Sequence, residues 1–144
     1  MNQRGVTLVE LVVSIVVVAI AISAVLGTLA FASTSSADAM VRQQAVSIAS
    51  AYLEEILLRS YIDPDGVDGE GTRAAFDDVD DYDGLSNTGA QDQLGTAIDG
   101  LEQYRVDIEV VPETISGVNA LRVDVSVDAP SGPTVVLSGY RTNI

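Results

Sequence analysis

The sequence contains no cysteine, no histidine and no lysine among its 144 residues. Without cysteine and histidine, the chain has no disulfide, no thiolate nucleophile and no imidazole base, and it lacks the usual zinc and iron ligands. Neither a phosphate-binding loop of the form G-x-x-x-x-G-K-[ST] nor a nucleophile elbow of the form G-x-S-x-G is present. Catalysis would have to rest on carboxylates, hydroxyls and arginine, so we expect that the protein is not an enzyme.

Positive charge is scarce as well. Seven arginines stand against 21 aspartates and glutamates, which gives a formal net charge of −14 at pH 7. A chain with this balance repels the phosphate backbone, so we expect no nucleic acid among its partners. The length is sufficient for one domain with an appended segment.

The N-terminal part of the chain is long and apolar. A short polar leader, residues 1–5, precedes an apolar stretch from Val6 to Ala32 that contains no basic residue. About 20 apolar residues suffice for a helix to cross a bilayer. Arg4 lies before this stretch and acidic residues dominate after it, so the leader should stay in the cytoplasm and the remainder should be exported. We predict a leader peptide (1–5), a hydrophobic transmembrane and assembly helix (6–35) and a globular head (36–144).

Glu10 does not fit an ordinary membrane anchor. It lies one helical turn inside the apolar stretch, where a carboxylate costs about 2–3 kcal/mol on insertion scales. Cleavage after Gly5 would give Val6 a positive amine four residues before Glu10, on the same helix face and at the helix N-terminus. Glu10 would then pair with this amine, within one subunit or between neighbours.

The segment from Gly5 to Val12, GVTLVELV, resembles the class III signal of type IV prepilins and pseudopilins. The resemblance implies that a prepilin peptidase cleaves after Gly5 and methylates Val6, and that Glu10 is the carboxylate that docks the subunit into a filament. The usual first mature residue is Phe, whereas this chain has Val6. The implied partners are other pilin subunits, the prepilin peptidase, an inner-membrane assembly platform and, before assembly, membrane lipid. The implied location is the inner membrane, as a single-pass protein with its head in the periplasm, and then a cell-surface pilus.

Two other interpretations of the N-terminus remain open. The A-x-A pattern formed by Ala30, Phe31 and Ala32 permits a conventional secretory signal peptide that is cut before Ser33. The whole stretch could also be a simple, uncut signal anchor. Both interpretations leave Glu10 without a purpose.

The remaining chain predicts an α+β head. Apolar residues recur at helical spacing in Val41, Ala45, Ile48, Tyr52 and Ile56, so we expect one helix from about Val6 to about Arg59, with a weak point at Ser33–Ser36. Apolar and polar residues then alternate over 104–110, 121–128 and 135–140, which indicates strands separated by turns. We predict a type IV pilin fold: a long N-terminal helix on a small antiparallel sheet of about three strands within 104–141.

The segment between these parts, 63–100, is a predicted acidic loop. Nine of its residues between Asp63 and Asp83 are acidic, with one arginine among them. A solvated loop is one interpretation, and a calcium site is the other, because calcium prefers several carboxylate oxygens. The candidate calcium ligands are Asp77, Asp78, Asp80, Asp81 and Asp83.

Within this loop the string from Phe76 to Leu85, FDDVDDYDGL, resembles minor pilins of the mannose-sensitive haemagglutinin (MSHA) pilus, of the MshD kind. This resemblance implies a low-abundance subunit with roles in pilus biogenesis, surface attachment and biofilm formation. The alternatives are a minor pseudopilin of a type II secretion system, an adhesin at a filament tip, and a secreted or membrane-anchored acidic calcium-binding domain.

Overall fold

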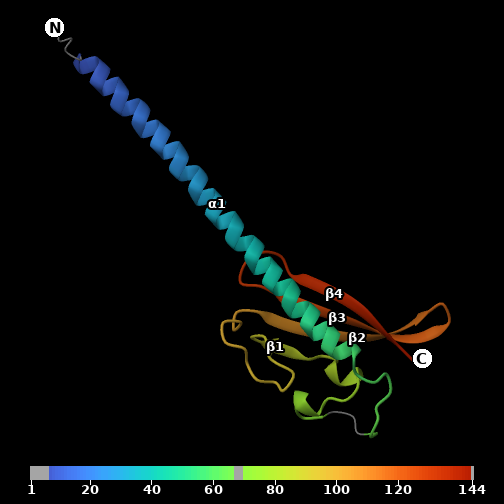
Figure 1. Ribbon diagram of the computed structural model, residues 1–144. Coiled ribbons are helices and arrows are strands. Elements are labelled where there is room, and N and C mark those ends of the chain that lie inside the picture. Colours follow the sequence, from blue (N-terminus) through green and yellow to red (C-terminus); the bar gives the residue numbers. More distant parts are fainter. Residues whose placement is uncertain (1–6, 67–69, 144) are drawn as a thin grey trace. The chain divides into compact units, whose positions relative to one another are not determined.

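The computed structural model describes residues 7–66 and 70–143, and the side chains of these residues except 31–37. Gly5 and Val6 therefore lie outside the described residues. The element order is one long helix, two 3₁₀ turns and four strands (Figure 1): α1 (Leu8–Leu57), Arg73–Ala75, Asp80–Tyr82, β1 (Ser86–Thr88), β2 (Arg105–Ile115), β3 (Val118–Asp128) and β4 (Val135–Thr142). The chain divides into two compact units, Met1–Ala39 and Met40–Ile144, and each is described by itself.

The described part of the first unit is helical. Its large apolar side chains from Leu8 to Leu29 are exposed on every side of the helix. The stretch Leu8–Ala30 is long and apolar enough to cross a membrane. Ser14 and Ser23 donate their hydroxyl hydrogens to the carbonyls of Glu10 and Ala19, at 2.7 and 2.8 Å. Because these hydroxyls are satisfied inside the helix, the surface that it offers to lipid or to other helices is apolar.

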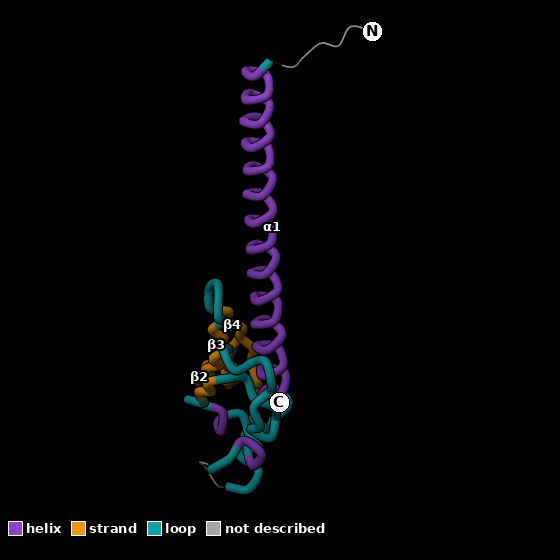
Figure 2. Tube along the Cα trace, turned by 90° about the vertical axis from the view of Figure 1, so that its left-hand side faces the viewer, coloured by secondary structure: helices purple, strands orange, loops and turns teal. Residues whose placement is uncertain are grey.

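The second unit is a helix packed on one face of an antiparallel sheet (Figure 2). The predicted stripe is confirmed, because the described side chains of α1 that are buried are Ala45, Ile48, Ala49, Tyr52, Glu55 and Ile56. The opposing sheet residues are valines and an isoleucine at alternate positions: Val106, Ile108, Val110, Val123, Val125 and Val127. Every second residue of β2 and β3 therefore faces the apolar stripe of α1, and these side chains form one core.

The sheet order is β1-β2-β3-β4, with every neighbouring pair antiparallel. Strands β2 and β3 are joined by a two-residue turn at Ser116 and Gly117, both with positive φ (51° and 85°), which is the geometry that suits a tight hairpin. At Gly139 in β4, an added Cβ would lie 2.7 Å from Leu57 Cδ1, so this glycine lets the end of α1 approach the sheet.

The structure differs from the sequence prediction in three details. A fourth strand, β1, lies inside the predicted acidic loop and pairs with β2. The helix ends at Leu57, before the predicted Arg59. The backbone stays helical through the expected weak point at Ser33–Ser36.

Candidate functional site

The first turn of α1 carries the candidate assembly residue. Glu10 lies in this turn and is exposed, and it is the one ionisable residue between Leu8 and Ala30. The Thr7 hydroxyl oxygen accepts a hydrogen bond from the Glu10 backbone N–H at 3.3 Å, and the Thr7 carbonyl accepts one from the Leu11 N–H at 3.1 Å. Thr7 is therefore the N-cap of the helix.

The sequence contains a helix-capping pattern at this position, which is separate from the prepilin resemblance. Thr7 and Glu10 are spaced as S/T-x-x-E, the pattern of a capping box. The cap starts the helix immediately before Leu8, so that Glu10 lies where the helix dipole favours an anion. Cleavage after Gly5, methylation of Val6 and docking through Glu10 stay predictions, because the first two positions lie outside the described residues.

The acidic loop is partly packed, not freely solvated. Phe76, Val79 and Tyr82 are buried, and the rings of Phe76 and Tyr82 meet edge to face with centroids 4.9 Å apart. The loop also forms a bridge to the residue Ser60, which follows α1, through Asp78. Burial of these three apolar side chains fixes the carboxylates between them in place.

Three of the five candidate calcium ligands accept hydrogen bonds from backbone N–H groups. Asp81 Oδ2 accepts hydrogen bonds from the N–H groups of Asp77 and Asp78 at 3.0 and 3.3 Å, and Asp78 Oδ1 accepts one from the Asp81 N–H at 3.0 Å. Asp83 Oδ1 accepts a hydrogen bond at 2.8 Å from the N–H of Val110 in β2. Asp80 is exposed.

The structure brings carboxylates together in a different combination. Among the described residues, the groups whose oxygens lie within 4.8 Å of one another are Asp63, Asp65 and Asp77, and Glu70, Asp77 and Asp81. Asp77 and Asp81 thus lie in such a group, whereas Asp78, Asp80 and Asp83 do not. Glu70 Oε2 and Asp77 Oδ1 are buried and lack a hydrogen-bond partner among the described residues.

Crowding of these carboxylates changes their pKa values. The pKa of Glu70 is raised to about 7, chiefly because its protonated form can share a hydrogen bond with the Asp81 carboxyl. Burial raises the pKa of Asp77, and the charges of Asp65 and Asp63 add to this rise. A proton or a cation would relieve the same repulsion.

Lowering the pH should stabilise this loop. Because the folded-state pKa of Glu70 lies above its ordinary 4.5, the stability from its protonation is fully present below about pH 4.5 and is lost as the pH rises through 7. We expect the full chain in detergent to melt a few degrees higher at pH 6 than at pH 8, and Glu70→Gln to remove most of the difference. Glu102→Gln is the matched control, since the N–H of Gly100 lowers the pKa of that carboxyl. An unchanged pH dependence in Glu70→Gln would contradict this account.

The same melting experiment separates the two interpretations of the loop. A calcium ion bridging Asp77, Asp81 and Glu70 would raise the melting temperature at pH 8, and a chelator would reverse the rise. Equal melting curves with calcium and with chelator would exclude calcium binding, and protonation of Glu70 would remain as the way in which the repulsion is relieved.

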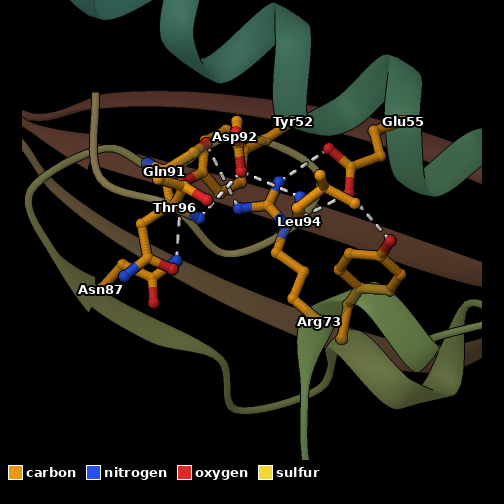
Figure 3. Close-up of polar contacts among 9 residues, drawn as sticks. Tyr52, Glu55, Arg73, Asn87, Gln91, Asp92, Leu94 and Thr96 are labelled. Atoms are coloured by element: carbon orange, nitrogen blue, oxygen red, sulfur yellow. Dashed lines mark hydrogen bonds and ion pairs between the residues drawn. The ribbon is translucent and has the colours of Figure 1, made fainter.

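A buried ion pair attaches the loop to α1 (Figure 3). Arg73 donates from Nε and Nη2 to the two carboxylate oxygens of Glu55, at 3.1 and 2.7 Å, and both side chains are about 95 % buried. Tyr82 donates its hydroxyl hydrogen to Glu55 Oε1 at 2.9 Å, and burial together with this carboxylate raises the pKa of Tyr82 to about 12. The bidentate geometry is the strong form of an arginine–carboxylate contact.

Tyr52 extends this network to the second half of the loop. The Arg73 guanidinium lies 4.1 Å from the centroid of the Tyr52 ring, in cation–π geometry. The Tyr52 hydroxyl oxygen accepts hydrogen bonds from the N–H of Gln91 at 2.7 Å and from the amide of Asn87 at 3.4 Å. Sequence reasoning missed this network, since its members are up to 39 positions apart and follow no period.

The comparisons with known proteins give one match. A family model described as the prokaryotic N-terminal methylation motif matches residues 1–30. No curated protein matches the chain, and no solved structure matches it. The motif and the apolar helix support a membrane-anchored structural subunit of the type IV pilin or pseudopilin kind.

Proposed function

We propose that the chain is a minor pilin of a type IV pilus of the MSHA kind. In this proposal the prepilin peptidase cleaves after Gly5 and methylates Val6, and the N-terminal helix assembles the subunit into the filament from an inner-membrane platform. The head faces the periplasm first and the cell surface later. The pilus supports surface attachment and biofilm formation. The observation that carries the proposal is the methylation motif at the start of a helix, α1, whose last turns form the core of an α+β head.

The charge of the head favours a minor role over a major one. Residues 40–144 carry 19 acidic side chains and six arginines. Heads of this charge repel one another when they pack within a Debye length of about 8 Å. A filament made mostly of this chain would need many counterions, whereas a single copy among less acidic subunits would not.

The N-terminus of the mature protein tests the class directly. We expect intact mass and N-terminal sequencing of the protein from its native host to show a chain that begins at methylated Val6, and only when the prepilin peptidase is present. A chain beginning at Ser33 would indicate a secreted acidic domain. A chain retaining Met1 would indicate a simple membrane anchor, and either result would overturn the filament assignment.

A minor pseudopilin of a type II secretion system shares the motif, the peptidase and α1. Deletion of the gene separates the two candidates, because loss of surface pili indicates a pilin and loss of enzyme export indicates a pseudopilin.

A further inference from the structure

A pocket opens in the head between α1 and the segment 90–101. Its volume is about 370 Å³, which lies in the range of ligand-binding clefts. The walls are mostly apolar and come from both elements: Ile48, Ala51, Tyr52, Ala90, Ile98 and Leu101. The paired side chains of Glu55 and Arg73 also line it. The helix and the segment thus supply complementary halves of one cavity.

The far wall of the pocket is held in place before anything binds. Asp92 closes a tight turn, because its N–H donates to the Thr96 carbonyl at 2.9 Å and its Oδ1 accepts hydrogen bonds from the N–H groups of Leu94 and Thr96 at 2.9 and 2.8 Å. Gln91, the residue before this turn, is bonded to Tyr52 and Arg73. A fixed wall lowers the entropy cost of binding.

Apolar side chains continue from the pocket onto the surface. Leu94, at the tip of the turn, is 70 % exposed, and Ile98, in the wall, is 39 % exposed. Asp92, Arg73 and Tyr52 all line the pocket, and Figure 3 shows their side chains together. An apolar cavity with exposed apolar neighbours and a polar border is typical of a protein-binding site.

Charge decides what kind of partner fits. Arg73 is the one cation among the lining residues that the structure gives, and Glu55 neutralises it. Asp92 lines the pocket, the exposed Asp99 follows the wall residue Ile98 in the sequence, and Glu102 lies just beyond the segment. A second copy of this chain would bring a head with the same acidic excess, so the partner that fits best carries positive charge.

We propose that this pocket receives an apolar side chain that stands next to a lysine or arginine on a different subunit of the same filament. The apolar group fills the cavity, and its basic neighbour meets Asp92 and the acidic excess of the segment that carries it. This inference rests on the proposed function, because it takes the partner to be another filament subunit. Beyond the proposed function, the inference gives the place where that subunit binds and the kinds of side chain with which that subunit binds.

Photo-crosslinking in the native host tests the site with the full chain. In one variant, p-benzoylphenylalanine replaces Ser47, which lines the pocket. In the matched control it replaces Gln43, which is exposed one turn earlier on α1. The expected adduct from position 47 is a peptide with an apolar residue beside lysine or arginine, in another protein that carries a prepilin signal. A peptide of this chain itself, a lipid adduct, or equal yields from both positions would overturn the proposal.

Two substitutions test the same site by filament content. Ala51→Trp fills the exposed side of the pocket, and Asp99→Arg reverses the charge of the exposed residue that follows the wall residue Ile98. We expect each to lower the amount of chain in sheared filaments about tenfold, while Gln43→Trp stays within about twofold of wild type. Melting curves identify any variant that fails to fold. Absence of the wild-type chain from filaments would refute the proposed function, whereas normal incorporation of both variants would refute the pocket alone.

Discussion

Glu10→Ala is expected to leave cleavage after Gly5 and methylation of Val6 intact, but to lower the amount of chain in sheared filaments tenfold or more. The reason is the amine that cleavage creates at Val6. Removing one partner of a charge pair in a low-dielectric setting costs about 3–5 kcal/mol, because the other charge is left uncompensated. A loss of about 1.4 kcal/mol already corresponds to a factor of ten in assembly.

Quantitative immunoblots of sheared filaments and of membranes, together with N-terminal sequencing, measure this effect. Glu10→Gln is the informative companion, because it keeps the size and hydrogen-bonding capacity of the side chain and removes only its charge. Thr7→Ala serves as the control for helix capping, for which the expected cost is about 1 kcal/mol. Normal incorporation of Glu10→Gln would show that charge pairing is not what Glu10 contributes.

Arg73→Met is expected to have the largest effect on the stability of the head. The substitution leaves Glu55 buried without its counterion and without two hydrogen bonds. Such a break costs about 3–5 kcal/mol, which should lower the melting temperature by more than about 10 °C. The double variant Glu55→Met, Arg73→Met should recover much of the loss, because no unpaired charge remains.

Thermal unfolding of the full chain in detergent, followed by circular dichroism, measures this difference. The control is Arg105→Met, which breaks the surface pair with Asp107, where the Arg105 side chain is 60 % exposed. A surface pair of this kind contributes about 0–1 kcal/mol. Equal melting temperatures for Arg73→Met and Arg105→Met would mean that the buried pair does not attach the loop to α1.

The elements with a regular period were predictable from the sequence. The apolar residues at helical spacing from Val41 to Ile56, and the alternating apolar residues of β2, β3 and β4, predict which faces of these elements pack against the core. β1 was missed because Ser86, Asn87 and Thr88 contain no apolar residue that could mark a face. Its place follows from pairing with β2, which is a tertiary contact.

The chemistry of the loop was only half predictable. The density of aspartates predicts repulsion. The direction of each carboxylate, however, depends on backbone N–H groups in other parts of the fold, such as the N–H of Val110 in β2, which donates to Asp83. In the same way, Arg73 was visible in the sequence as the single cation of the loop. Its partner, Glu55, looked like one more polar residue of a helix, and only the packed fold shows that the two side chains meet.

Gly139 sets a rule for how this protein can vary. A methyl group in place of its Cα hydrogen would lie only 2.7 Å from Leu57 Cδ1 and 3.2 Å from Leu53 Cδ1. The sizes of these three residues are therefore not independent. A related chain that carries alanine at position 139 has to accommodate it with a smaller or differently turned side chain at 53 or 57, so the three positions should change together during evolution.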